Sequence, residues 1–199
     1  MIGGKIWTEN TKFRQSISPS IRLAATLRFL ASGDSFTSLM YTCRISKQAI
    51  SQFVPEVYEA IISALQKFMK MPKSTCEWVY IAENSSARWN FPNCLGSIDG
   101  KHIQTVSPAH SGIMFLNYKG FFSIVLLAVA RANYVIYAGV GCQGQISDDR
   151  VFSHTMLYEK IHKGKLGIPE PKVLPGRTKP IHYVFVADDA FALSKNIIA

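Results

Sequence analysis

Two acids stand directly after strand-like stretches of this chain, and both are candidates for chemistry. Asp99 follows the apolar segment "CLGSI", and Asp188 follows "YVFVA". If these segments are neighbouring parallel strands, the two carboxylates emerge at the same edge of the sheet. Like charges held close together resist ionisation unless a cation offsets their repulsion. A hard divalent cation such as Mg²⁺ accepts this arrangement of carboxylates.

Such a site supports chemistry at phosphodiester bonds. Mg²⁺ binds through one or two carboxylates and keeps waters and phosphate oxygens as its other ligands. Two ions about 4 Å apart can activate an attacking water or hydroxyl and stabilise the leaving oxygen. A basic protein with this site would be a nuclease or a strand-transfer enzyme. The alternative interpretation is that each Asp only caps the turn or helix that follows, a common use of Asp after a strand.

The residues between the two acids predict a sheet. The run "FFSIVLLAVA" at 121–130 is nearly all apolar and rich in β-forming residues, which is typical of a strand buried on both faces. A turn at 131–133 leads into "YVIYAGVG" at 134–141, which continues the β pattern. These two segments predict an antiparallel hairpin.

One helix and one further strand are expected beyond the hairpin. The helix runs from about Arg150 to His162, the Pro-rich segment 168–182 is expected to be a loop, and "YVFVAD" at 183–188 is the last strand. Together with the strand at "CLGSID", this order predicts an α/β fold. Its sheet is expected to be mixed, with at least one parallel pairing.

The first part of the chain predicts three helices. The first begins at Ser18 and ends before Gly33, the second occupies "SFTSLMYTC", and the third begins near Ser46. Pro55 either divides the third helix or begins a fourth. The apolar residues of the first helix are expected to face inward, namely Ile21, Ala24, Ala25, Leu27, Phe29 and Leu30.

These helices have the layout of a helix-turn-helix, with the turn around Arg44 and Ile45. Polar groups early in the third helix can donate to base edges and phosphates. A helical subdomain with a merely solvated face is the alternative. The candidate DNA contacts are Lys47, Gln48 and Ser51 on this helix, and Lys119 and Arg150 further along the chain.

The expected organisation is a helical region, a connecting segment and an α/β domain. Three aromatic residues of the connecting segment are expected to anchor the junction. The expected bounds are 1–75, 76–93 and 94–199, and the anchors are Trp78, Trp89 and Phe91.

The composition limits the classes of binding partner and of site that this chain can have. The formal charge is +9, with Lys and Arg spread along the chain, which favours a polyanionic partner. The four cysteines form no CxxC pair, which excludes a zinc knuckle or a thioredoxin-type site and predicts reduced thiols. The longest apolar run, 120–130, is too short to span a bilayer, and no signal peptide is visible, so neither secretion nor membrane insertion is expected.

Several motifs in one order resemble the DDE superfamily endonucleases of the PIF/Harbinger transposase type. They are "CLGSIDGKHI", "NYKGFFSIVLLAVARANYVIY", "VGCQGQISDDRVF" and "YVFVADDAFAL". The resemblance runs from about Trp89 to the end. The helical segment "RLAATLRFLASGDSFTSLMYTCRISKQAIS" is also similar to the region that precedes the nuclease domain in this family.

The resemblance implies an RNase H-like core, a divalent metal ion, and hydrolysis or strand transfer at DNA phosphodiester bonds. The family's first two catalytic and metal-binding acids fall on Asp99 and Asp188. Asp148 matches the acid of an "ISD" segment and has a supporting role, and Asp189 is secondary at most. His102 is expected to lie close enough to Asp99 to touch a bound phosphate.

The family's third acid, a Glu, has no match in this sequence. It is expected some tens of residues beyond Asp188, on a helix after one more strand, so the expected core is truncated at its C-terminus. Two hypotheses stay open: a metal-dependent endonuclease that needs a third acid from further sequence, and a non-catalytic DNA- or protein-binding module. The resemblance implies a Myb-like partner protein and a nuclear location, with the cytoplasm as a second one.

Overall fold

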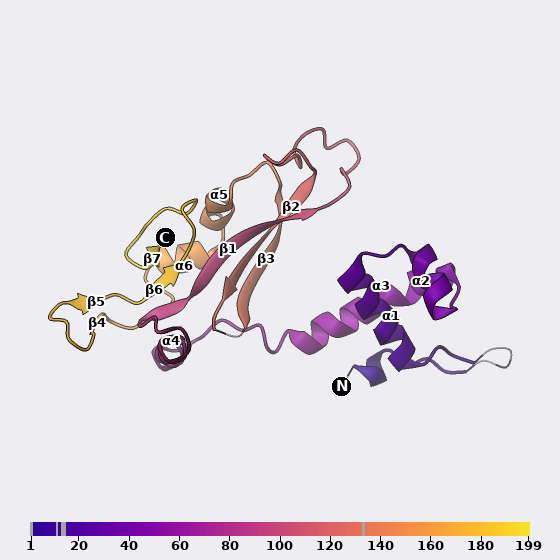
Figure 1. Ribbon diagram of the computed structural model, residues 1–199, viewed down its shortest axis with the longest axis horizontal. Coiled ribbons are helices and arrows are strands. Elements are labelled where there is room, and N and C mark those ends of the chain that lie inside the picture. The colour runs from indigo at the N-terminus through magenta and orange to yellow at the C-terminus, as the bar shows by residue number, and fades with distance from the viewer. Residues whose placement is uncertain (1, 11, 13–14, 133) are drawn as a thin grey trace. The chain divides into compact units, whose positions relative to one another are not determined.

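The computed structural model describes residues 2–10, 12, 15–132 and 134–199. The chain forms two compact units, Met1–Phe68 and Met69–Ala199 (Figure 1). The first unit is helical and the second combines a sheet with helices. Among the described residues, none of the helices is long and apolar enough to cross a membrane.

The first unit contains the three predicted helices. After a 3₁₀ turn at Gly3–Lys5 come α1 (Pro19–Ser32), α2 (Phe36–Cys43) and α3 (Lys47–Leu65). The residue before each helix is a serine whose side chain accepts a backbone N–H three residues on, and Gly33 ends α1 in the left-handed conformation. These serine caps explain why the starts of the helices could be predicted.

Pro55 lies inside α3 and does not divide it. Proline removes one backbone hydrogen bond of a helix, and an isolated helix would bend or end there. Here Phe53, Val54 and Val57 are buried on either side of it, and their packing against α1 and α2 keeps the helix continuous. The expected break is therefore wrong.

The expected inner face of α1 is confirmed at Ala25, which is buried, and at Phe29, which packs against the core, but it is wrong at three other positions. Ile21, Leu27 and Leu30 are 49%, 49% and 56% exposed. The buried face instead carries Arg22, whose Nη1 donates to the carbonyl oxygen of Ile6 at 2.6 Å. The same guanidinium pairs with the carboxylate of Glu56. These partners stabilise a buried cation, and the face of α1 that carries Arg22 turns inward in place of Ile21, Leu27 and Leu30.

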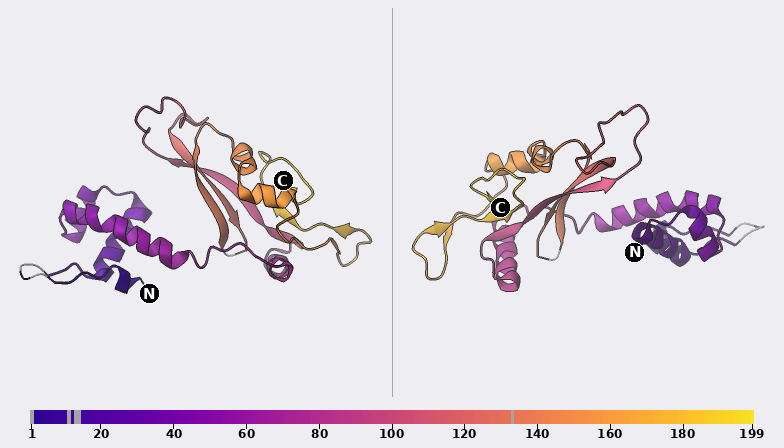
Figure 2. Two further views of the ribbon diagram at one scale, coloured as in Figure 1. Left: turned by 180° about the vertical axis from the view of Figure 1, so that it is seen from behind. Right: turned by 45° about the horizontal axis from the view of Figure 1, so that its top comes forward.

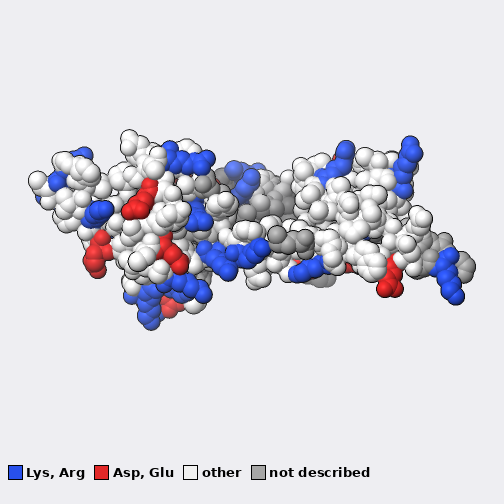
Figure 3. Space-filling view, turned by 90° about the horizontal axis from the view of Figure 1, so that it is seen from below, with Lys and Arg blue, Asp and Glu red and all other residues white. Residues whose placement is uncertain are grey.

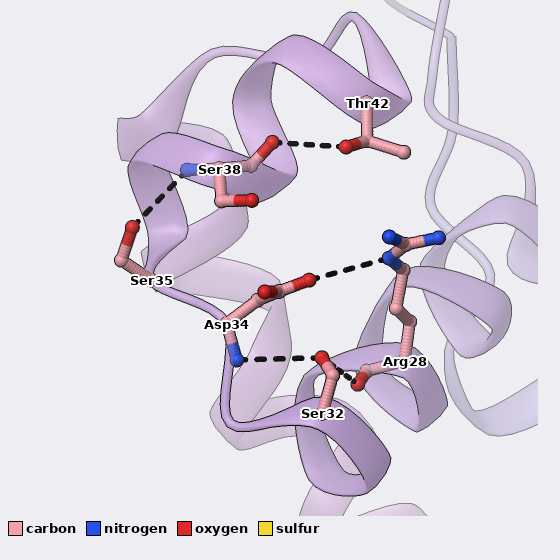
Figure 4. A network of polar contacts seen from close by, with 6 residues as sticks. All are labelled: Arg28, Ser32, Asp34, Ser35, Ser38 and Thr42. Carbon is pink, nitrogen blue, oxygen red and sulfur yellow. Dashed lines mark hydrogen bonds and ion pairs between the residues drawn. The ribbon is translucent and has the colours of Figure 1, made fainter.

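Polar contacts hold the connection between α1 and α2 (Figure 4). Arg28 Nε pairs with Asp34 Oδ2 at 3.4 Å, and Ser32 Oγ accepts the backbone N–H of Asp34 at 3.3 Å. Ser35 Oγ then accepts the N–H of Ser38 at 3.2 Å, which starts α2. These contacts stabilise the short turn between α1 and α2.

The second unit is built on a mixed five-stranded sheet in the order β3-β2-β1-β6-β7. β1 pairs antiparallel with β2 and parallel with β6, β2 pairs antiparallel with β3, and β6 pairs parallel with β7. The α/β class, the hairpin and the parallel pairing are confirmed, as in an RNase H-like fold. The strands are β1 (Cys94–Gln104), β2 (Ser123–Ala130), β3 (Val135–Gln143), β6 (Val184–Val186) and β7 (Ile197–Ile198).

Three details of this unit differ from expectation. The helix expected at 150–162 is two helices, because Thr155 caps a new one by accepting the N–H of Tyr158. The Pro-rich segment contains a small hairpin, and the last residues form β7. The additional elements are α4 (Thr75–Trp89), α5 (Asp148–Ser153), α6 (Met156–His162), β4 (Lys172–Val173) and β5 (Pro180–Ile181).

Helix α4 takes up most of the predicted connecting segment and packs against β1 within the second unit (Figure 2). Trp78 is completely buried, its ring meets Phe185 edge-on with centroids 5.7 Å apart, and its Nε1 donates to the carbonyl of Leu166 at 2.9 Å. Trp89 and Phe91 are 63% and 40% exposed, so only one of the three expected aromatic anchors is buried.

Candidate active site

The pairing of β1 with β6 brings the two predicted acids together. Ser97 lies opposite Val186, the last residue of β6. Two residues further along each parallel chain stand Asp99 and Asp188. Asp99 is still within β1, whereas Asp188 follows the end of β6, so the register places the two acids at the same edge of the sheet. Both side chains are exposed.

A bulge at Gly96 sets this register. Cys94 lies opposite Val184, but the next pair is Gly96 with Phe185, so β1 contains one extra residue. Without it, Ile98 rather than Asp99 would stand beside Asp188. Gly96 has φ +149°, and a Cβ there would lie 2.5 Å from the carbonyl oxygen of Ala130. Only glycine allows this close approach.

Strand β1 does not end at Asp99 as its sequence suggested. It continues to Gln104 along β2, while its other neighbour, β6, stops at Val186. From Asp99 onward, one edge of β1 is therefore free of strand pairing with β6. The acids gather at this edge.

Asp148, in the first turn of α5, lies against Gly100 of β1. A Cβ on Gly100 would be 2.3 Å from the Cγ of Asp148, so the absence of a side chain creates the space for this carboxyl. Its Oδ1 is buried and has no hydrogen-bond partner among the described residues. The α5 helix thus brings a further carboxyl against β1, next to the residue that follows Asp99.

The pKa of Asp148 is raised above its ordinary value by its surroundings. Burial raises the pKa of this carboxyl most, and His102 opposes that rise. The negative charges of Asp188 and Asp99 raise the pKa further, while Lys119 lowers it. Both predicted acids are thus close enough to Asp148 to affect its ionisation.

Asp148→Asn is expected to stabilise the protein at neutral pH by about 0.5–1 kcal/mol, because a half-buried charge without a partner is removed. Since the folded-state pKa is raised, the folded protein holds more protons than the unfolded chain, and stability falls as pH rises through this window. The gain should disappear below the ordinary carboxyl pKa, where both states are protonated. Thermal unfolding at about pH 3 and pH 7 measures this difference.

Asp149→Asn provides the matched control. This neighbour is in the same helical turn, but its Oδ1 accepts the backbone N–H of Ala192 at 3.1 Å. Its replacement should lower stability or leave it unchanged at pH 7. An equal gain in both variants would contradict a specific burial of Asp148.

Asp188 also caps its own turn. Its Oδ1 accepts the backbone N–H of Ala190 at 2.9 Å, as the alternative interpretation of a strand-terminal Asp expects. Oδ2 has no hydrogen-bond partner within the described part of the chain and is free for a ligand. Asp189 is exposed. Capping and cation binding are compatible, since they use different oxygens.

The donor set fits a hard cation only in part. In the ranges that the structure describes, no group of three or more His, Cys, Asp and Glu side chains is placed to hold a metal ion. Mg²⁺ needs only one or two carboxylates when waters and phosphate oxygens complete its shell. Asp99 and Asp188 meet that smaller requirement, and a closed protein cage is not formed.

His102 lies on the other face of β1 from Asp99, because the two residues are three positions apart in an alternating strand. It is therefore on the face of Gly100, near Asp148. Its Nδ1 is 3.0 Å from Ser123 Oγ, and Ser123 also contacts Asn117. Sequence reasoning missed Ser123 and Asn117, since isolated polar residues give no signal of burial.

The candidate DNA contacts fall in both units. Lys47, Gln48 and Ser51 are exposed in the first two turns of α3, after the turn at Arg44. Lys119 and Arg150 are exposed in the second unit. On the face shown in Figure 3, Lys and Arg are distributed over each unit with acids among them, and they do not merge into one patch.

Comparisons with known proteins agree on one family. A family model described as "DDE superfamily endonuclease" matches residues 98–199, just over half of the chain. "Protein ALP1-like" of Arabidopsis thaliana is 29% identical over 180 residues, which cover 89% of this chain and 43% of that protein. "Putative nuclease HARBI1" of Homo sapiens is 25% identical over 155 residues, 77% of this chain and 44% of that protein.

The HARBI1 protein of Xenopus laevis gives a similar result, with 25% identity over 154 residues, 75% of this chain and 44% of that protein. The chain thus spans less than half the length of these curated relatives. No solved structure matches it.

Proposed function

This chain belongs to the DDE superfamily endonucleases, and on that premise we propose that it cleaves DNA phosphodiester bonds with Mg²⁺ or Mn²⁺ as cofactor. Asp99 and Asp188 are the proposed metal ligands and catalytic residues. One observation supports the proposal: the bulge at Gly96 shifts β1 by one residue, so that Asp99 and Asp188 each follow the paired residues Ser97 and Val186 by two positions.

The chain's own residues have distinct proposed tasks. Asp99 and Asp188 present carboxylate oxygens at one edge of the sheet. When bound, Mg²⁺ or Mn²⁺ supplies Lewis-acid activation and neutralises charge at the scissile phosphate. Asp148, held against Gly100, adds negative potential at the same edge and favours cation binding there. Lys119 and Arg150 are proposed to contact the DNA backbone.

The second candidate function is a non-catalytic DNA- or protein-binding module. Two observations favour it: no three-ligand group is found within the described residues, and exposed Lys47, Gln48 and Ser51 follow the helix-turn-helix-like turn of the first unit. The third acid of the family remains unassigned here. A DNA substrate, a Myb-like partner and a nuclear location are proposed on family resemblance alone.

Cleavage of supercoiled plasmid by the full chain tests the proposal. We expect nicked product with Mn²⁺ or Mg²⁺, and none with EDTA. A gel-shift measurement with the same DNA runs in parallel. Retention of DNA without nicking at any metal concentration would support the binding module and contradict the endonuclease.

A further inference from the structure

A buried polar network links β1 to the long connection between β1 and β2. Ser123 is completely buried, and Asn117 is 5% exposed. Ser123 Oγ is 3.0 Å from Asn117 Nδ2 and 3.0 Å from the Nδ1 of half-buried His102. In a buried network every hydrogen must find an acceptor, so the bonding pattern determines where each proton lies.

The orientation of the Asn117 amide is fixed by two backbone donors. Its Oδ1 accepts the N–H of Lys119 at 2.9 Å and that of Phe121 at 3.2 Å. Backbone N–H groups can only donate, so the atom facing them is the oxygen. The atom facing Ser123 is then Nδ2, which can only donate. The ambiguity that usually affects side-chain amides is removed here.

The hydroxyl of Ser123 therefore accepts from Asn117 and must place its own hydrogen elsewhere. His102 Nδ1 is the acceptor within reach among the described residues. In a neutral ring, an Nδ1 that accepts this hydrogen carries no proton, and the proton is then on Nε2. The two backbone donors of the loop thus determine the tautomer of a histidine more than ten residues away.

We infer that Asn117 and Ser123 hold His102 as a neutral Nε2–H donor for a DNA phosphate oxygen at the acidic edge of β1. Within the described residues Nε2 has no hydrogen-bond partner, and it is not among the buried unpartnered atoms, so a ligand can reach it. His102 shares the strand face of Gly100, where Asp148 lies. Asn117 and Ser123 are positioning residues in this arrangement.

Asn117 also positions a second group for the same anion. By accepting the backbone N–H of Lys119, it fixes the backbone of the loop from which the Lys119 side chain extends. The Lys119 ammonium is 5.4 Å from the ring centroid of Tyr118, and that ring meets His102 edge-on at 5.6 Å. A neutral donor on β1 and a cation on the adjoining loop suit a phosphate oxygen. This inference rests on the proposed DNA substrate, although the tautomer does not.

Nitrogen-detected NMR of the histidine rings tests the tautomer independently of any activity. The chain has five histidines, and the spectrum of His102→Gln identifies the signal of His102. We expect the Nε2–H form in the unmodified chain. In Asn117→Asp the loop acceptor remains but the donor is lost, so the Ser123 hydroxyl turns to the carboxylate and the His102 preference should disappear. Ser111→Ala, in the same loop but outside this network, should leave the tautomer unchanged.

An Nδ1–H ring in the unmodified chain, or an unchanged tautomer in Asn117→Asp, would overturn the positioning role. The phosphate contact is tested by the affinity for a duplex oligonucleotide. A Gln amide reaches the place of Nε2 and an Asn amide that of Nδ1. His102→Gln should therefore bind within about three-fold of the unmodified chain, and His102→Asn about ten-fold more weakly.

Equal losses in both variants, or no loss in either, would overturn the phosphate contact. A chain that binds no DNA at all would overturn the proposed function and this contact together. The NMR result would then still support or overturn the tautomer by itself, so the two failures are distinguishable.

Discussion

Asp99→Asn and Asp188→Asn are each expected to lower metal-dependent DNA cleavage by about a thousand-fold or more. An amide of the same shape keeps the strand register set by Gly96 but removes the negative charge that binds the cation. A thousand-fold corresponds to about 4 kcal/mol of lost transition-state stabilisation, which is of the order that one essential electrostatic interaction provides. Rates of plasmid nicking at saturating Mn²⁺ measure the loss.

The double variant should be no slower than the slower single variant, because the two carboxylates act on one cation and their effects are not additive. Asp189→Asn is the local control: it is exposed, adjacent in sequence, and expected to change the rate by less than ten-fold. Unchanged cleavage in both single variants would show that other residues carry the activity.

Trp78→Ala is expected to reduce the free energy of unfolding by about 3–5 kcal/mol. The indole is fully buried, packs edge-on against Phe185, and donates from Nε1 to the carbonyl of Leu166. Phe185 lies opposite Gly96 at the bulge, so the cavity would form directly under the pairing that aligns the two acids. Denaturant unfolding measures the change, and metal affinity should fall with it.

Trp89→Ala in the same helix separates burial from residue type. This side chain is 63% exposed, and its loss should cost at most about 0.5 kcal/mol. Similar losses in the two tryptophan variants would indicate that α4 does not pack as described.

Much of the fold was predictable because local signals and global packing agree. Serines at 18, 35 and 46 mark helix starts that the structure retains. The apolar run at 121–130 and the following β-rich segment form the predicted hairpin. The sheet class follows from the order of strands and helices, since these short-range patterns leave few ways to bury the apolar residues.

The failures share a physical cause, which is that burial can be decided by a distant partner. Arg22 faces inward because its guanidinium donates to the carbonyl oxygen of Ile6 and pairs with the carboxylate of Glu56. The spacing of apolar residues in α1 does not reveal these distant partners. The end of β1 was misplaced because Asp99 resembles a strand terminus. The strand continues because β2 pairs with it as far as Gln104.

In the candidate site, too, some residues could be predicted from the local sequence and others could not. Asp99 and Asp188 could be selected from their position after apolar segments, and the predicted parallel pairing of these segments is present as far as Ser97 and Val186. The bulge that aligns them, and the space over Gly100 that admits Asp148, depend on backbone geometry that a sequence pattern does not specify. Asn117 and Ser123 are recognisable only once their burial is known.

The central claim is that Asp99 and Asp188 form one cation site, and titration calorimetry with Mn²⁺ tests it most directly. The account predicts binding to the unmodified chain, no binding to the Asp99→Asn, Asp188→Asn double variant, and retained binding in Glu170→Gln, an exposed acid elsewhere in the same unit. Binding that survives in the double variant, or its absence from the unmodified chain, would contradict the account.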